Sequence, residues 1–267
     1  MKLLDFLILP DVRNVTDLDD VSTTLLHSRI IRKKPFLEKQ YRAFYNIFSR
    51  SIDCTDKETL FVELGSGGGF LKEVIPTVVT SDVVDIPTVD KHFSALDMPF
   101  EDNTVDRFFM IDVLHHISDP AQFFQELDRC LKIGGKTIMI EPANTLWSRF
   151  IYKNFHHEPF DQTTGWELNG KGPLSSANGA IPWIIFYRDR KRFELDFQSL
   201  KVLKLTPHTP FGYLLSGGVS MRQLLPSFAY GVVRGLEWAL SPLNRFIGMF
   251  ITIEIGKQMK DCQNEEC

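Results

Sequence analysis

Residues 61–71 of this chain read FVELGSGGGFL, and the predicted fold is built outward from this stretch. The apolar run at its start has the length of a buried strand, and four glycines follow within 65–69. Glycine accepts positive φ and lets backbone approach a ligand closely. The segment 70–75 can begin a helix, which Pro76 would end. A strand that turns through glycines into a helix start predicts a cofactor cradle, because the helix start offers unpaired N–H donors.

The spacing of the glycines indicates the kind of cofactor. The dinucleotide-binding fingerprint needs glycine at its first, third and sixth positions, and the sixth position here is Phe70. The loop residues concerned are Glu63, Gly65, Ser66, Gly67 and Gly69. Their Glu-x-Gly-x-Gly-x-Gly spacing resembles the first motif of the class I S-adenosylmethionine-dependent methyltransferases. The resemblance implies that the loop passes under the amino-acid end of S-adenosylmethionine, with Glu63 near its ammonium group. A glycine-rich turn without a ligand is the alternative.

Two further acidic residues extend the cofactor site. The run TVVTSDVV predicts a second parallel strand with Asp82 at its carboxyl end. Ligands bind at that edge of open α/β sheets, and a carboxylate there can accept hydrogen bonds from both ribose hydroxyls. Asp85, three residues later, is the alternative. The segment ALDMPF resembles the part of these methyltransferases that holds adenine. This implies that Asp97 accepts a hydrogen bond from the adenine amino group and that the Met98 backbone N–H contacts the ring.

The stretch that begins at Asp112, DVLHHISDPAQFFQELDRCLKIGGKTIMIEP, closely resembles the fourth and fifth motifs of the type 11 branch of this family. Around it we expect a fourth strand over 107–111 and a fifth over 136–142. The helix between them should start at Asp119, a good N-cap before proline, and end at the glycine pair 134–135. The resemblance implies that Asp112 sits at the strand tip beside the transferable methyl group.

Two histidine pairs are candidates for chemistry. His115 and His116 follow the fourth strand, and histidine near neutral pH can take a proton from an acceptor hydroxyl, so both are candidate general bases. The alternative is that they only pack at the entry to the helix. His156 and His157 stand in FHHEPFD, which lacks the H-x-x-x-H spacing of a helical metal site. We therefore expect no metal.

Composition limits the class of protein. The chain has 267 residues, 43% of them apolar and 24% charged, which is typical of a globular domain. The net charge of −4 gives no reason to expect nucleic acid as a partner. The four cysteines lack metal-ligand spacing and indicate a reducing, cytoplasmic location. We expect residues 1–10 to form a packed arm rather than a signal peptide, and the polar tail 258–267 to be disordered.

The predicted fold is an α/β, Rossmann-like sheet of seven mostly parallel strands with helices on both faces. Residues 1–58 form an N-terminal helical cap, with a helical stretch over 23–50 that Pro35 interrupts. Its Tyr41 and Tyr45, four apart on one helix face, are candidates to line the cofactor pocket.

The methyltransferase domain is expected over 59–257, with two insertions that cap the carboxyl edge of the sheet, at about 143–183 and 211–246. Between them a helix over 184–200 and a sixth strand over 200–205 are predicted, and 250–255 alternates as an antiparallel last strand. The apolar stretch 226–241 is buried, pairs with a partner, or lies in a membrane interface. Its charges argue against a transmembrane span.

The functional hypothesis is therefore methyl transfer from S-adenosylmethionine to a small-molecule or lipid-like acceptor, with O-, N- or C-methylation unresolved. The apolar second insertion favours an apolar acceptor. Through residues 211–246 we also expect either peripheral membrane contact or a homodimer. A non-catalytic binding or assembly subunit with a methyltransferase-like fold is the alternative. An NAD-dependent oxidoreductase is a weaker one, because Phe70 breaks its fingerprint.

Overall fold

The computed structural model describes residues 6–259, except 14, 16, 18, 53–58, 157, 169, 171 and 173–175. Its centre is a seven-stranded sheet with the order β3-β2-β1-β4-β5-β7-β6. Within these described strands only β7 is antiparallel to its neighbours β5 and β6. The strands are β1 (Phe61–Glu63), β2 (Val79–Asp82), β3 (Lys91–His92), β4 (Val105–Ile111), β5 (Leu131–Pro142), β6 (Leu200–His208) and β7 (Phe250–Lys257). The predicted mostly parallel sheet with an antiparallel last strand is confirmed.

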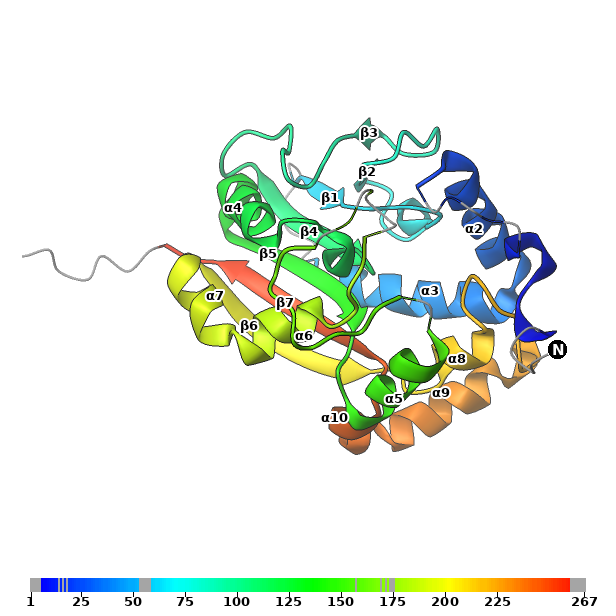
Figure 1. Cartoon of the computed structure of the whole chain (residues 1–267). Coiled ribbons are helices and arrows are strands. Elements are labelled where there is room, and N and C mark those ends of the chain that lie inside the picture. Colours follow the sequence, from blue (N-terminus) through cyan, green and yellow to red (C-terminus); the bar gives the residue numbers. More distant parts are fainter. Residues whose placement is uncertain are drawn as a thin grey trace, which may run out of the picture.

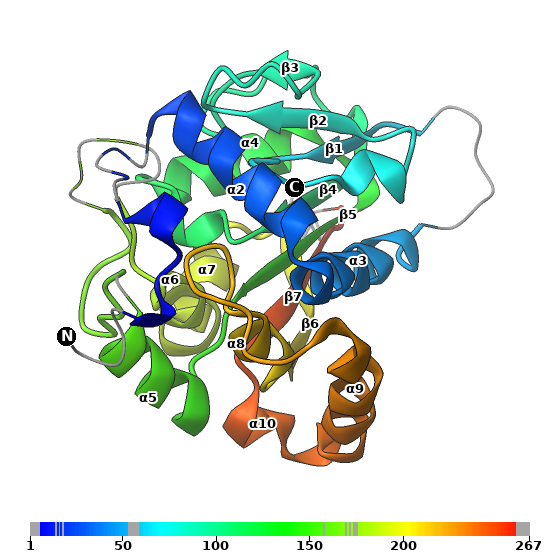
Figure 2. The same cartoon turned by 90° about the vertical axis from the view of Figure 1, so that its right-hand side faces the viewer.

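Helices surround this sheet (Figures 1 and 2). They are α2 (Val21–Lys33), α3 (Pro35–Ser49), α4 (Pro120–Cys130), α5 (Leu146–Phe155), α6 (Ile181–Trp183), α7 (Arg190–Asp196), α8 (Gly212–Ser216), α9 (Tyr230–Ala239) and α10 (Asn244–Ile247). Both views have β3 at the top, while α9 and α10 lie at the bottom near β6. Helices α9 and α10 therefore lie at the opposite end of the sheet from β3.

Successive residues of β4 show how the two faces of the sheet are covered. Side chains alternate across a strand, so Phe108 and Phe109 point to opposite faces. Phe109 stacks on Phe48 of α3 at a ring distance of 4.9 Å. Phe108 contacts Phe100, whose carbonyl accepts a hydrogen bond from Arg129 of α4. Helix α3 therefore covers one face of the central strands, and α4 lies on the other.

The N-terminal segment forms two helices that meet at Pro35, as predicted. The Asp20 side chain accepts the Ser22 backbone N–H and caps α2, and Pro35 starts α3 at its first position. The described part of the N-terminal arm packs against the second insertion, because Ile8 pairs with Met221 as an antiparallel bridge.

The prediction of a helix directly after the glycine loop is wrong. In the described stretch 59–82 the chain makes only a three-residue 3-10 turn, Leu71–Glu73, before β2 begins at Val79. The Phe70 N–H is already used by the Tyr45 hydroxyl, and Pro76 leaves room for little more than one turn. Helices α2 and α3 lie beside the loop instead, and the Arg32 guanidinium covers the Phe70 ring at 4.1 Å.

The predicted end of α4 at the glycine pair is also wrong. Helix α4 starts with Asp119 as its N-cap, as expected, but it ends at Cys130 and β5 begins at once. The register between β4 and β5 then shifts, and Gly134 has φ of 82° within the irregular stretch. The glycines therefore shape a bulge near the start of a strand rather than a helix end.

The two predicted insertion regions contain α5 and α6, and α8 to α10, respectively. Helix α9 is not buried: only Val233 and Glu237 are shielded, while its outer side chains face solvent. None of the helices in the described part of the chain combines the length and apolarity that crossing a bilayer requires. From residue 260 on, the tail that the sequence predicts to be disordered lies outside the described residues.

Phe124 of α4 provides a test of the packing. Its ring is fully buried and lies 5.0 to 5.9 Å from the rings of Phe186, Phe193 and Phe197. Phe124→Ala should lower the free energy of unfolding by about 3–5 kcal/mol, because it leaves a cavity in the core. Leu195→Ala, at a 71% exposed position of α7, is the control and should change it by less than about 0.5 kcal/mol. Urea denaturation measures both, and equal effects of the two substitutions would contradict this packing.

Candidate functional site

A cavity of about 1200 Å³ lies along the edge where the parallel strands β2, β1, β4 and β5 end. Its walls come from the glycine loop, the N-terminal helices and both insertions. Pockets for one small ligand usually measure about 300–1,000 Å³, so this cavity has room for two molecules side by side.

The glycine loop is held in an unusual backbone conformation. Gly65 and Gly67 have φ of 65° and 51°, which side chains of L-residues rarely adopt. The Gly67 N–H donates to Asp82 at 2.8 Å, and the Ser66 N–H donates to the Ser81 carbonyl at 2.9 Å, so the loop is tied to β2. A Cβ at Gly67 would meet nothing closer than 3.9 Å, which leaves space for a ligand above the loop.

The next two glycines are needed for a different reason. A Cβ at Gly68 would lie 2.6 Å from the Ser28 backbone nitrogen of α2, and a Cβ at Gly69 would collide with the Tyr45 hydroxyl. Helix α2 therefore rests on the loop without space for a side chain. Tyr41 and Tyr45 of α3 both line the cavity, which agrees with their predicted position.

Glu63, the last residue of β1, is buried in the cavity wall at 3% exposure. Its Oε2 atom has no hydrogen-bond partner among the described residues. Burial raises the pKa of Glu63 to about 7, although a hydrogen bond with Ser66 opposes the shift. A buried carboxylate oxygen without a partner is costly, so this position suits a ligand with a cationic or N–H donor group.

Asp82 occupies the carboxyl end of β2, as predicted, and it lines the cavity. Its two oxygens accept the backbone N–H groups of Gly67 and Val84 at 2.8 and 2.9 Å. Burial raises the pKa of Asp82, and these hydrogen bonds partly offset the shift. Asp85, the alternative, is exposed and does not line the cavity.

The expected adenine-contacting pair, Asp97 and Met98, lies outside the cavity lining. Asp97 is exposed, and the Met98 N–H donates instead to the Glu126 carboxylate of α4 at 2.8 Å. Residues 93–96 line the cavity in their place. Two interactions account for this: the Asp97 N–H bonds to the Ser94 carbonyl and closes a turn, and Glu126 of the distant helix α4 holds the Met98 N–H.

Asp112 follows the last residue of β4 and forms part of the cavity wall. Its φ of 55° is rare outside glycine, and its N–H donates to the Ile140 carbonyl of β5 at 2.9 Å. Withdrawal from water raises the pKa of Asp112 to about 7, with His115 opposing the shift and two glutamates adding to it. Asp112 therefore lies at a strand tip and lines the cavity, while its place beside the transferable methyl group stays a prediction.

His115 is buried between two carboxylates. Its Nδ1 lies 2.7 Å from Glu141 Oε2, and its Nε2 lies 3.5 Å from Glu158 Oε2. The other oxygen of Glu141 accepts the backbone N–H groups of Val113 and Leu114 at 2.9 and 2.8 Å. Burial alone would lower the pKa of His115, but its bonds to the two glutamates outweigh this and raise it well above its usual value.

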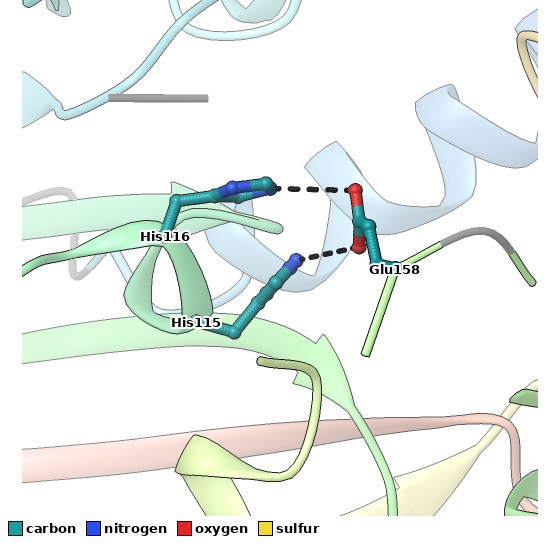
Figure 3. Close-up of side chains that lie close together, drawn as sticks. All are labelled: His115, His116 and Glu158. Carbon is teal, nitrogen blue, oxygen red and sulfur yellow. Dashed lines mark ion pairs between the residues drawn. The ribbon is translucent and has the colours of Figure 1, made fainter. Parts of the chain in front are cut away.

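His116 has the opposite character. Its Nδ1 lies 3.2 Å from the Ser176 carbonyl, and its Nε2 lies 3.8 Å from Glu158 Oε1. Burial and the neighbouring His115 lower the pKa of His116 to about 4, so this ring is neutral at pH 7. Figure 3 shows both imidazoles directed at the Glu158 carboxylate. Burial would raise the pKa of Glu158, but the histidines hold it well below its usual value.

The sequence analysis missed Glu141, Glu158 and the lining segment 93–96. A signal for Glu141 existed, because it is a charged residue at the end of an apolar strand. Glu158 follows His156 and His157 in the sequence, and this HHE string lacks the spacing of a local metal motif. In the structure its partners are His115 and His116, with His156 Nδ1 at 3.8 Å, while His157 lies outside the described residues.

Part of the chain matches a protein-family model. Residues 62–139 match the model of a family described as "Methyltransferase domain", the type 11 branch. This segment runs from β1 to β5 and includes the glycine loop, Asp82, Asp112 and both candidate histidines. No curated protein matches the chain.

Several solved structures with similar folds are titled as methyltransferases. One from Thermotoga maritima, an S-adenosylmethionine-dependent methyltransferase titled as a possible histamine N-methyltransferase, has a TM-score of 0.50 at 14% identity. The match covers 87% of this chain and 99% of that one, and it supports the fold. The geranyl diphosphate C-methyltransferase of Streptomyces coelicolor has a TM-score of 0.49 at 13% identity, over 94% of this chain and 88% of that one.

The contact between α2 and the glycine loop can be tested by substitution. Gly68→Ala places a methyl group 2.6 Å from the Ser28 backbone, so α2 must shift, and we expect a loss of about 1–3 kcal/mol in unfolding free energy. Gly231→Ala in α9 is the matched control, because its Cβ meets nothing within 4 Å, and it should be neutral or stabilising. Chemical denaturation compares the two, and a neutral Gly68→Ala would show that α2 does not rest on the loop.

Proposed function

We propose that this chain, which carries a class I S-adenosylmethionine-dependent methyltransferase domain, transfers a methyl group from S-adenosylmethionine to a small-molecule or lipid-like acceptor. The observation that carries this proposal is the unpartnered Glu63 oxygen beside an open glycine loop, in a cavity large enough for two ligands. When bound, S-adenosylmethionine supplies an activated methyl group on a sulfonium.

The residues present fit this cofactor. Glu63 would accept hydrogen bonds from its ammonium group, which satisfies the orphaned oxygen. Gly65, Ser66, Gly67 and Gly69 would pass under its amino-acid end, and Asp82 would take the ribose hydroxyls at the end of β2. For the adenine ring, the lining segment 93–96 is better placed than Asp97 and Met98, and we propose it instead.

Methyl transfer mainly requires the chain to align the reactants and to exclude water. Proximity and orientation of this kind contribute up to about 7–11 kcal/mol of barrier reduction. Asp112 lines the cavity at the end of β4, the strand next to β1, and by its resemblance to the family it would stand beside the transferable methyl group. Tyr41 and Tyr152 also line the cavity, and their buried rings help to keep water out.

The two candidate bases differ in suitability. A raised pKa keeps His115 protonated at pH 7, so it cannot accept a proton there and serves to position its neighbours. His116 is neutral at pH 7, and with Nδ1 engaged by Ser176 its Nε2 can accept a proton. If the acceptor is a hydroxyl, we propose that His116 is the base.

The far part of the cavity favours an apolar acceptor. Apolar side chains of both insertions and of the β7 start line it, namely Phe155, Phe160, Leu214, Val219, Met221 and Met249. Such walls stabilise a lipid-like molecule by removing its apolar surface from water, at about 25 cal/mol per Å². Both insertions contribute, so the acceptor is enclosed by segments outside the matched family region.

The direct test is isothermal titration of the full chain with S-adenosylmethionine. Glu63→Gln should weaken binding by at least about tenfold, because it removes a charge-assisted hydrogen bond. For the wild type, affinity should fall as pH drops from about 7.5 to 5.5, since Glu63 with its pKa of about 7 becomes protonated and must release a proton on binding. Glu63→Gln should lack that part of the pH dependence.

Absence of saturable binding at millimolar cofactor would overturn the proposal. Binding without turnover, when cell extract is supplied as the source of acceptor, would favour the alternative of a non-catalytic subunit with a methyltransferase-like fold. Asp102→Asn, at an exposed position remote from the cavity lining, is the control for nonspecific effects of charge removal.

We propose in addition that the second insertion brings the enzyme to a lipid surface. Four large apolar side chains on and just before α9 are exposed: Phe228 by 86%, Trp238 by 80%, Val232 by 76% and Leu236 by 51%. We call these residues the α9 surface. An exposed apolar patch of this kind marks an interaction site, and lipid there would be the source of an apolar acceptor.

Replacing Phe228 and Trp238 together by serine should abolish cosedimentation with vesicles of phosphatidylcholine and phosphatidylglycerol, because both anchoring rings are lost. The exposed Leu195→Ser, on α7, is the control and should cosediment like the wild type. The opposite outcome is a wild type that fails to cosediment with vesicles and elutes as a dimer in size-exclusion chromatography, while the double variant elutes as a monomer. That result would contradict membrane binding and show that the α9 surface binds a second copy of the chain.

A further inference from the structure

Three side chains from two distant segments converge on one point of the cavity wall. His115 and His116 lie on the short turn after β4, and Glu158 comes from the first insertion (Figure 3). One possible ligand atom from each residue lies within 4.8 Å of the others. All three residues line the cavity.

The hydrogen bonds behind the two imidazoles orient their lone pairs. The Nδ1 of His115 is engaged by the Glu141 carboxylate, and the Nδ1 of His116 is engaged by the Ser176 carbonyl. Both acceptors require a proton on Nδ1, which assigns the lone pair of a neutral ring to Nε2. Histidines that bind metals are held in the same manner, by a carboxylate or backbone carbonyl on the other nitrogen.

The distances fit a cation better than direct hydrogen bonds. The Nε2 atoms of His115 and His116 lie 3.5 and 3.8 Å from oxygens of Glu158. Good hydrogen bonds between such groups measure about 2.7–3.2 Å. Two ligand atoms that are each about 2.1 Å from a tetrahedral ion lie about 3.4 Å apart. The distances between the ligand atoms of the cluster are therefore close to those around a bound ion.

We propose that His115, His116 and Glu158 bind a divalent transition-metal cation, with Zn²⁺ as the best fit, in the acceptor part of the cavity. Two imidazoles and one carboxylate are a donor set that suits Zn²⁺, and three protein ligands leave a fourth position open. Glu141 and the Ser176 carbonyl would hold the histidines in place from behind.

The charges around the cluster favour this occupant. Asp112, Glu141 and Glu158 bring three carboxyl groups to His115, and His116 packs beside it. His156 and Tyr152 are further titratable groups near these carboxylates. A divalent ion between the ligands would bring two positive charges to these carboxylates.

The open position gives the site a role in acceptor recognition, and this part rests on the proposed function. Since it faces the cavity, it would take an oxygen of the acceptor, such as a hydroxyl or carboxylate. A metal-bound hydroxyl has a lowered pKa, so its proton would pass to water before the methyl transfer. With the ion bound, His116 Nε2 would be a ligand, and His116 would serve as the base only in the metal-free site. The sequence did not predict a metal, because Glu158 lies 42 residues after His116 and the three ligands form no local motif.

The test uses the full, untagged chain after dialysis against a chelator. Titration with Co²⁺ should give visible d–d absorption that saturates at one ion per chain, and Zn²⁺ should bleach it. His116→Ala and Glu158→Gln should each weaken Zn²⁺ binding by at least about 100-fold in competition with a chromophoric chelator. His92→Gln, which removes an exposed histidine outside the cavity lining, should bind like the wild type.

Absence of saturable binding in the wild type, or equal affinity in the wild type, His116→Ala and Glu158→Gln, would overturn the metal site. Circular dichroism of each variant excludes loss of fold as the cause of weaker binding. The two proposals fail separately: a chain that binds Zn²⁺ but not S-adenosylmethionine keeps this site and loses the proposed function. A chain with the opposite behaviour keeps the function and loses the metal.

Discussion

Four carboxyl groups at the ends of four adjacent parallel strands are the constraint on which the site depends. Glu63 ends β1, Asp82 ends β2, Asp112 follows β4, and Glu141 lies near the end of β5. Taking a carboxylate out of water is costly unless donors or cations compensate for the lost hydration. Two of the four carboxylates receive their hydrogen-bond donors from the chain, and the other two are positioned to accept donors from a ligand.

Asp82 and Glu141 are compensated by the chain itself. Asp82 accepts two backbone N–H groups and fixes the glycine loop against β2, while Glu141 accepts two N–H groups and holds His115. Glu63 and Asp112 have no comparable set of donors, and the pKa of each is raised to about 7. The two less compensated groups face the cavity, at the positions where a cationic cofactor would lie.

The sequence predicted the part of the site that local pattern determines. Asp112 directly follows an apolar run of strand length, and Asp82 follows Val78 and Val79 after two small polar residues. Their place at the sheet edge could therefore be predicted from the sequence, as could the glycine loop. Asp97 could not be placed in this way, because a turn closed by Ser94 and the Glu126 carboxylate decide where residues 97–98 point. The missing helix after Phe70 has the same kind of cause, since Tyr45 and α2 come from a distant segment. The first insertion contributes Glu158, whose proximity to His115 and His116 arises only when the chain is folded and has no signal in the sequence.

We expect S-adenosylmethionine to bind in the part of the cavity between Glu63 and Asp82. A crystal structure of the full chain with S-adenosylhomocysteine tests it most directly. We expect the ammonium group within hydrogen-bond distance of Glu63 Oε2 and the ribose hydroxyls at Asp82. A nucleoside bound elsewhere, or side chains that close this hollow, would contradict the account.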